Sequence, residues 1–218
     1  LVSGAVRCWG DNQYGQLGDN TVATKSTPVQ VATGVREVAA GTTFSLFLKA
    51  DGSLWGMGRN EAGQLGRATT LTQSNVPILI DSGVTGIAAA GSTALYVKND
   101  GSLWGMGQNT AGNLGLGDTT NRASPTRIVA SGVRSVGAAG SSSYFRKQDG
   151  ALWGMGAAIG SIVPLSSSPS EISSSVLGLR GRAAALVPSR AGSWLSAPRG
   201  ACTRSPSRRA PRPGLPSN

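Results

Sequence analysis

The 218-residue sequence contains no histidine, and charged residues make up only 14% of it. Without an imidazole, mechanisms that need a histidine base or a histidine metal ligand are excluded. A charged fraction well below the ~25% of typical soluble domains argues against a helical bundle, whose exposed faces need Glu, Lys and Arg. No run of 18 apolar residues occurs, so we expect no membrane-spanning helix. Cys8 and Cys202 lie in zones of different composition and predict neither a disulfide framework nor a metal site.

The net charge of +10 is unevenly distributed along the chain. Residues 1–156 carry 12 basic and 9 acidic side chains (net +3), whereas residues 157–218 carry 8 and 1 (net +7). Nucleic-acid binding is therefore expected only through the C-terminal part. The chain begins with Leu1 and shows no signal peptide, which we interpret as a fragment of unknown compartment.

A repeat of about 49 residues organises the sequence. The string DGSLWGMG occurs at residues 51–58 and 100–107, DGALWGMG occurs at residues 149–156, and an earlier copy, VRCWG, ends at Gly10. The tryptophans of the four copies are Trp9, Trp55, Trp104 and Trp153, at spacings of 46, 49 and 49 residues. Glycine loops of the type GQLG, a proline and an Ala-Ala-Gly keep the same order in three units, which identifies a tandem repeat.

Each unit predicts four short strands and no helix. An apolar run such as FSLFLK, residues 44–49, is followed by Asp-Gly and SLWGMG, which indicates a hairpin with a type I′ turn. A third strand follows the proline, as at residues 76–80, and a fourth follows a Ser-Gly or Thr-Gly turn, as at residues 35–41. Four strands per unit are typical of a propeller blade.

We therefore expect an all-β fold, an incomplete β-propeller of about three four-stranded blades, over residues 1–156. Residues 157–178 form a degenerate fourth repeat, in which SPSEI at residues 168–172 weakly echoes SPTRI at residues 124–128. Residues 179–218 are rich in Arg, Pro and Ser and predict a mostly disordered basic tail. The abrupt loss of the repeat favours a tail read out of frame over a genuine nucleic-acid-binding arm.

The segments ADGSLWGMGRNEAGQLG and NDGSLWGMGQNTAGNLG resemble the regulator-of-chromosome-condensation repeat, in the plain style of bacterial members. The resemblance covers residues 1–156 and implies a seven-bladed propeller that binds proteins. In some members it implies nucleotide exchange on the small GTPase Ran, and in a plant member light sensing. Family repeats commonly carry Gly-x-x-His-Ser before the hairpin. The matching stretches at Gly41, Gly91 and Gly140 lack this histidine and also lack the tryptophans of the light sensor. We therefore expect neither nucleotide exchange nor light sensing from these residues.

Polar residues before each hairpin are the candidate partner-binding rim, because propeller loops recur on one rim and loops carry binding functions. They are Thr42, Thr43, Phe44, Ser92, Thr93, Ser141 and Ser142. The alternative is that they form solvated turns. We assign the four repeat tryptophans to the blade core rather than to a stacking platform. Asp51, Asp100 and Asp149 are assigned to Asp-Gly turns rather than to a ring of carboxylates.

The sequence thus predicts a non-enzymatic protein-interaction scaffold with an unidentified protein partner. No catalytic, cofactor-binding or metal-binding residue, and no cofactor, is assigned. The alternatives are a guanine-nucleotide exchange factor, nucleic-acid binding through the basic tail, and a truncated or frameshifted fragment without function. Open end blades would expose Trp, Leu and Met of LWGMG, so self-association of these blades is a further expectation.

Overall fold

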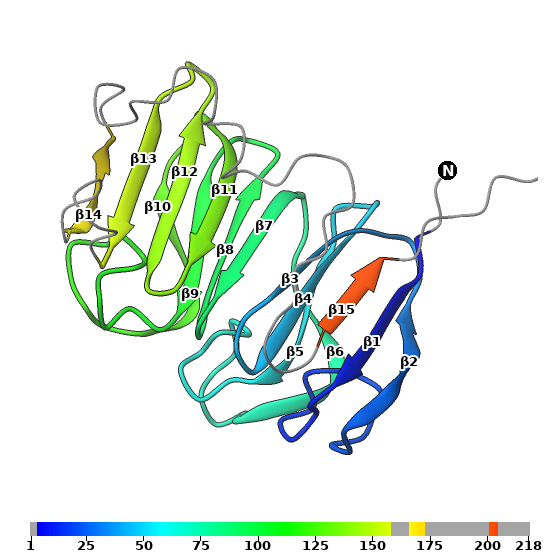
Figure 1. The fold of residues 1–218 in the computed structure, drawn as a ribbon. Coiled ribbons are helices and arrows are strands. Elements are labelled where there is room, and N and C mark those ends of the chain that lie inside the picture. Colours follow the sequence, from blue (N-terminus) through cyan, green and yellow to red (C-terminus); the bar gives the residue numbers. More distant parts are fainter. Residues whose placement is uncertain (1–3, 158–165, 173–200, 205–218) are drawn as a thin grey trace, which may run out of the picture.

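Four antiparallel β-sheets form the structure, and they lie side by side as blades (Figure 1). The computed structural model describes residues 4–157 and 166–172 in full, and residues 201–204 as a backbone strand. Within these ranges every regular element is a strand, and no helix long enough to cross a membrane occurs. The predicted all-β class and the incomplete propeller are confirmed.

Three of the four blades have four strands in chain order. Blade 2 contains β3 (Val35–Ala40), β4 (Phe44–Lys49), β5 (Leu54–Arg59) and β6 (Gln73–Asp81). Blade 3 contains β7 (Val84–Ala90), β8 (Thr93–Lys98), β9 (Leu103–Gly107) and β10 (Arg122–Val129). Blade 4 contains β11 (Val133–Ala139), β12 (Ser142–Lys147), β13 (Leu152–Gly156) and β14 (Ser166–Glu171). Blade 1 has three strands in the order β15 (Ala201–Arg204), β1 (Val6–Gly10) and β2 (Lys25–Ala32).

The weak echo of the repeat in residues 168–172 forms part of a regular blade. It lies mainly in β14, which pairs with β13 through Trp153 opposite Glu171 and Gly154 opposite Ser170. The degenerate segment therefore supplies the outer strand of blade 4. Apart from β15, the predicted tail at residues 179–218 lies outside the described residues.

The backbone register corrects one expectation about the cysteines. Strand β15 pairs antiparallel with β1, and Cys202 stands opposite Cys8 in this register. Cys8 is disulfide-bonded, so the sequence-based expectation of no disulfide is wrong. Composition zones were a poor guide because pairing between distant strands is independent of the composition of the intervening chain.

The Asp-Gly hairpins form where the sequence predicts them, but with a different turn. Gly52 has φ +84°, whereas Asp51 is not among the positive-φ residues, so a type I′ turn is excluded. The amide of Gly52 donates to the carbonyl of Lys49 at 3.1 Å, and the amide of Lys49 donates to Ser53 at 3.0 Å. This is the pattern of a three-residue loop that ends in a glycine bulge.

Side chains alternate between the two faces of each blade, as the pleat requires. On β4, Phe44, Leu46 and Leu48 pack against blade 3, in a cluster that includes Tyr96 and Met106. Phe47 points the other way and packs with residues of blade 1. The core is thus a series of layers between blades, and the small residues of β3, β7 and β11 suit the strands that contact one another at the inner edge.

The outer face of the last blade, blade 4, is less apolar than the sequence predicts. Met155 of LWGMG is buried against blade 3, and Trp153 packs on the same cluster. Phe145 packs against blade 3, so its neighbours Tyr144 and Arg146 lie on the face of blade 4 turned away from blade 3. The equivalent residues are Leu46 and Leu48 in blade 2 and Leu95 and Val97 in blade 3. The expectation is wrong for Trp153 and Met155, because both side chains point back into the preceding junction. Leu152 alternates with Trp153 and lies on the outer face, as expected.

Candidate functional site

Each blade has two ends, and loops of one kind gather at each end. The loop rim comprises the long loops at residues 11–24, 60–72 and 108–121 and the short turns at residues 41–43, 91–92 and 140–141. The opposite end, the hairpin rim, comprises the Asp-Gly turns and the Ser-Gly or Thr-Gly turns. The predicted partner-binding residues belong to the loop rim or to the first residues of the strands beside it.

A buried asparagine holds each long loop in shape. In the second loop Asn60 is 0% exposed; its Oδ1 accepts the amide of Leu65 at 2.8 Å, and its Nδ2 donates to the carbonyl of Leu71 at 2.7 Å. Asn12 and Asn109 act in the same way in the other two loops. Sequence reasoning missed this role, although an asparagine five residues before the leucine of each GQLG or GNLG loop was the available signal.

The predicted rim residues divide into an exposed and a buried set. Thr42 and Ser141 are exposed and Thr43 and Ser92 are half-buried, which leaves them accessible at the loop rim. The other three are buried: Phe44, Thr93 and Ser142. The hydroxyl of Thr93 donates to the carbonyl of Gln108 at 2.8 Å, so it supports the rim from below. Partner binding by the exposed set stays a prediction.

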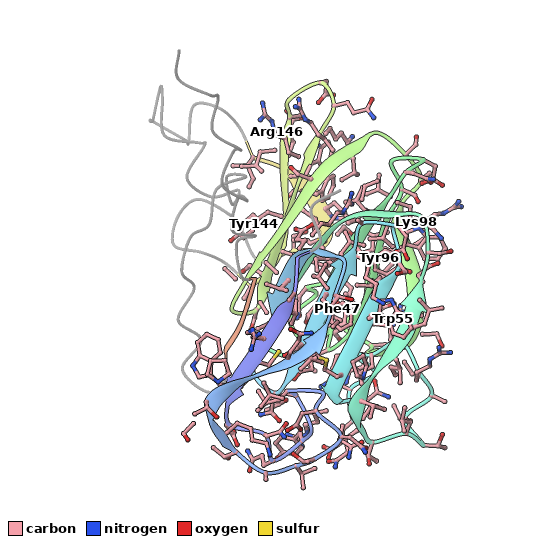
Figure 2. The ribbon with its side chains drawn as sticks, turned by 90° about the vertical axis from the view of Figure 1, so that its right-hand side faces the viewer. Phe47, Trp55, Tyr96, Lys98, Tyr144 and Arg146 are labelled. Carbon is pink, nitrogen blue, oxygen red and sulfur yellow. The ribbon has the colours of Figure 1, made fainter. Side chains whose placement is uncertain are left out.

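Three of the four repeat tryptophans, Trp55, Trp104 and Trp153, lie partly buried between blades, whereas Trp9 of blade 1 belongs to none of the described core clusters. Trp55 stacks on Phe47 of the neighbouring strand with ring centroids 6.3 Å apart (Figure 2). Its Nε1 donates to Ser53 Oγ at 2.9 Å, and that hydroxyl donates to Asp51 Oδ1 at 2.6 Å. The carboxylate therefore fixes both the turn and the tryptophan. Hydrogen bonds donated by Ser53, first from its hydroxyl and second from its amide, hold the pKa of Asp51 below its usual value.

The junction between blades 2 and 3 contains a partly buried polar network that the sequence analysis missed. Tyr96 is 0% exposed, and its hydroxyl donates to Asp81 Oδ2 at 2.8 Å. Lys98 Nζ lies 3.0 Å from both oxygens of the same carboxylate. Burial raises the pKa of Asp81, but hydrogen bonds from Tyr96, the amide of Ser82 and Lys98 outweigh it, so the pKa is lowered. Burial and then the Asp81 carboxylate raise the pKa of Tyr96.

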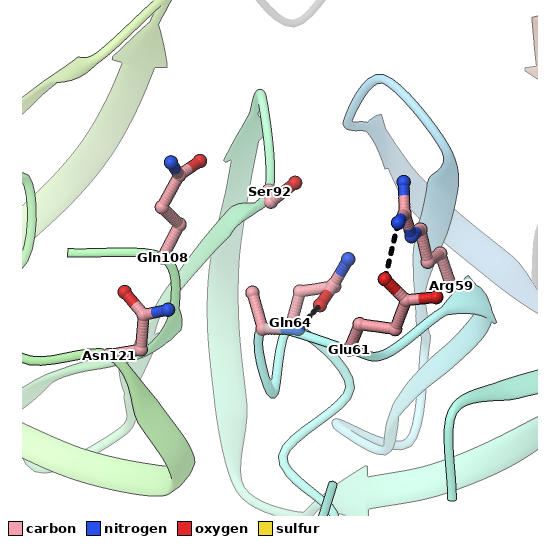
Figure 3. A pocket seen from close by; sticks show the side chains of 7 residues that line it. Arg59, Glu61, Gln64, Ser92, Gln108 and Asn121 are labelled. Atoms are coloured by element: carbon pink, nitrogen blue, oxygen red, sulfur yellow. Dashed lines mark hydrogen bonds and ion pairs between the residues drawn. The ribbon is translucent and has the colours of Figure 1, made fainter. Parts of the chain in front are cut away.

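A polar pocket of about 260 Å³ opens on the loop rim where blades 2 and 3 meet (Figure 3). Its lining residues are Arg59, Glu61, Ala62, Gln64, Ser92, Gln108 and Asn121. Blade 2 contributes the first four and blade 3 the last three. Arg59 forms an ion pair with Glu61, and its guanidinium carbon lies 4.8 Å from the ring centroid of Tyr14 in the neighbouring loop. Of the predicted rim residues, the pocket includes Ser92.

Close backbone approach locks each long loop against the next blade. A Cβ on Gly63 would lie 2.4 Å from Cα of Ala123, on the outer strand of blade 3. Gly15 approaches Asn75 of blade 2 in the same way, and Gly112 approaches Ser167 of blade 4. All three glycines have positive φ, so only glycine suits both the backbone and the contact. This contact keeps the two sides of the rim pocket in register.

The described residues contain no cluster of acidic or cysteine side chains that could hold a metal ion. The Asp51, Asp100 and Asp149 carboxylates each accept hydrogen bonds within their own turn. The side chains of the loop rim offer hydrogen bonding and ion pairing.

The model of the regulator of chromosome condensation (RCC1) repeat matches residues 3–48, 51–97 and 100–145, which together exceed half of the chain. The chain belongs to the RCC1 repeat family. The second and third matched segments begin at the Asp-Gly turns, at residues 51 and 100, so each family repeat joins the last two strands of one blade to the first two strands of the next.

Among curated RCC1-repeat relatives, the chain is 44% identical over 66 residues to human "Probable E3 ubiquitin-protein ligase HERC4", and 42% identical to the rat protein of that name. The match covers 28% of this chain and 6% of each relative, so it concerns a small part of their length.

Two solved structures resemble the fold. The human WBSCR16 structure has a TM-score of 0.66 and 26% identity, covering 79% of this chain and 48% of that one. Yeast RCC1 (Prp20), solved with Kap60 bound, has a TM-score of 0.66 and 21% identity, covering 78% and 45%. The chain thus spans about half the length of these propellers.

Proposed function

We propose that the chain is a protein-binding scaffold and that the loop rim, centred on the pocket between blades 2 and 3, is its binding surface. The pocket supports this proposal because its polar side chains do not form the hydrogen bonds that recur in every blade. In contrast, the residues that recur most strictly (the tryptophans, the turn aspartates and the loop asparagines) are occupied within their own blades.

The comparisons are compatible with this role. Yeast RCC1 has been solved in complex with Kap60, and a second structure of the yeast protein, Prp20p, was described together with its binding to Gsp1p and histones. These are properties of that protein. For this chain they support protein binding as the class of function, and nucleotide exchange is the competing outcome that the experiment below must separate.

The test is cross-linking of the purified chain to candidate proteins, with the cross-linked sites mapped by mass spectrometry. We expect partners to contact residues of the loop rim and binding to weaken in the Arg59→Ala variant. Arg134→Ala, at an exposed position beside the hairpin rim, removes the same charge away from the pocket and should bind normally. A partner that contacts only the hairpin rim would overturn the proposal. A saturable increase in GDP release from a Ran-type GTPase would assign exchange instead.

A further inference from the structure

The pocket between blades 2 and 3 contains three side chains with hydrogen-bond donors, Arg59, Gln64 and Asn121, beside the acceptors of Glu61 and Gln108. Gln64 is 1% exposed, and its Oε1 already accepts the amide of Ala62 at 3.0 Å. Its Nε2 has no hydrogen-bond partner within the described part of the chain. The Oδ1 of Asn121 accepts the amide of Asn109 at 2.9 Å, which leaves its Nδ2 to face the pocket (Figure 3). The Arg59 guanidinium adds positive charge at the same opening.

The equivalent amide in the next loop shows what a satisfied donor looks like. Asn113 occupies the Gln64 position in the third loop, and its Nδ2 donates to Thr93 Oγ1 at 2.6 Å and to the carbonyl of Gln108 at 3.1 Å. In blade 2 the position of Thr93 is occupied by Phe44, which has no acceptor side chain. The side chain of Gln64 lines the pocket instead, so an acceptor that enters the pocket can take the place that Thr93 Oγ1 and the Gln108 carbonyl have for Asn113.

We propose that this pocket binds a carboxylate of an acidic protein segment. Gln64 Nε2 and Asn121 Nδ2 donate hydrogen bonds to the carboxylate, and Arg59 neutralises its charge, because charge-assisted hydrogen bonds are the strong ones. The inference rests on the proposed protein-binding function and names the chemistry of the partner. The volume of about 260 Å³ is large enough for an Asp or Glu side chain that enters from the rim.

Glu61 competes with a ligand carboxylate for Arg59. It is paired with Arg59, but the two side chains are 52% and 35% exposed, and exposed ion pairs are weak because solvent screens them. A carboxylate from the partner can therefore replace that of Glu61 on Arg59. It follows that Glu61→Gln should strengthen binding of an acidic ligand, the opposite of the effect expected for a residue that contacts the ligand.

The experiment titrates the full-length chain with an acetylated, amidated hexaglutamate peptide and follows side-chain amide signals by NMR. Hexaglutamine with the same ends is the uncharged probe. Gln64→Glu and Asn121→Asp each exchange one donor for a carboxylate of the same shape. Gln148→Glu, exposed on the hairpin rim, makes the same charge change away from the pocket. Asn121 is exposed, so its variant keeps the test valid if Gln64→Glu fails to fold.

We expect hexaglutamate to shift the amide signals of Gln64 and Asn121. Its affinity should fall about tenfold or more in Gln64→Glu and Asn121→Asp, the size expected for a hydrogen bond to a charged group, and should be nearly unchanged in Gln148→Glu. Equal binding of hexaglutamine, or an equal loss in Gln148→Glu, would overturn the inference.

If mapped partners contact the loop rim while hexaglutamate does not shift the amide signals of the pocket residues, the carboxylate inference fails and the proposed function stands. If hexaglutamate binds the pocket but partners contact the hairpin rim, the proposed function fails.

Discussion

Blades 3 and 4 share one backbone plan but differ in how their polar side chains are satisfied. In blade 3, Trp104 Nε1 donates to Ser102 Oγ at 2.8 Å. In blade 4 that serine is Ala151, and Trp153 Nε1 is buried without a hydrogen-bond partner. Both hairpins still form, since Asp149 Oδ1 accepts the amide of Ala151 at 2.9 Å. The turn therefore needs the carboxylate, whereas the hydroxyl serves the tryptophan.

The blade junctions differ in a similar way. Asp81 and Tyr96 form a hydrogen-bonded pair between blades 2 and 3. At the positions 49 residues earlier and later, the pairs are Ala32 with Phe47 and Ala130 with Phe145. Two junctions thus have an apolar pair and one has a polar pair, and no junction mixes the two types. The repeat tolerates either solution, provided that both partners change together.

The largest effect is expected from breaking the polar junction. Asp81→Ala leaves the buried Tyr96 hydroxyl without its acceptor and should lower the free energy of unfolding by about 1–3 kcal/mol. The double variant Asp81→Ala/Tyr96→Phe recreates the Ala–Phe pair of the other junctions and should recover much of the loss. Urea denaturation measures both, with the exposed Glu171→Ala as the control for loss of charge. Additive losses in the double variant would show that the pair is not coupled.

The same junction predicts a pH dependence. The pKa of Asp81 is lowered in the folded protein, so its contribution to stability is present above the unfolded value near 3.8 and is lost as the pH falls through the folded pKa. The stability difference between wild type and Asp81→Ala should be constant from pH 7 to 5 and should narrow below about pH 4. Urea midpoints at each pH measure this difference. A gap that widens in acid would contradict the assigned hydrogen bonds.

An intermediate effect is expected from exchanging the serine and alanine of the two hairpins. Ala151→Ser supplies an acceptor for Trp153 and should stabilise the chain by about 1 kcal/mol, and Ser102→Ala should destabilise it by about the same amount. Tryptophan fluorescence and thermal unfolding report both changes. Ser168→Ala, at an exposed position of blade 4, should be neutral. Loss of stability in Ala151→Ser would show that blade 4 cannot accept the blade 3 arrangement.

The smallest effect is expected from removing the lysines that lie over the tryptophan rings, and it should differ between Lys147 and Lys98. Lys147 Nζ is 4.2 Å from the Trp153 ring centroid, and no ion pair is recorded for it among the described residues. Lys147→Ala should therefore cost only about 0.5 kcal/mol, the value of an exposed cation–π contact. Lys98→Ala should cost more because Lys98 also pairs with Asp81. Equal losses in the two unfolding curves would assign no net stabilisation to the Lys98–Asp81 ion pair.

The fold could be predicted from sequence because its determinants are local and repeat. The Asp-Gly turns, the strand alternation and the glycine loops each recur in three units. An assignment made in one unit is therefore supported by the same pattern in the other two. The turn type was predicted wrongly because Asp-Gly suits both type I′ turns and glycine-bulge loops, and hydrogen bonding beyond the dipeptide decides between them.

The rim pocket was only partly predictable. Ser92 was found because it lies in a repeated polar turn. Arg59, Gln64 and Asn121 were missed because they come from a strand end and two loops of two blades and meet only after the blades dock. Asp81 and Tyr96 were missed for the same reason, although the paired replacement of Ala–Phe by Asp–Tyr was visible in an alignment of the repeats.

The Asp81–Tyr96 pair also has a consequence for how such an array can evolve. The contacts of Gly15, Gly63 and Gly112 with the following blade are equivalent, so gain or loss of one 49-residue unit by unequal recombination would preserve them. Asp81 lies in blade 2 and Tyr96 in blade 3. A recombination breakpoint between these two positions would set the carboxylate against a phenylalanine, or the phenol against an alanine. Purifying selection should therefore act against recombination at this one boundary, which fixes the order of the units.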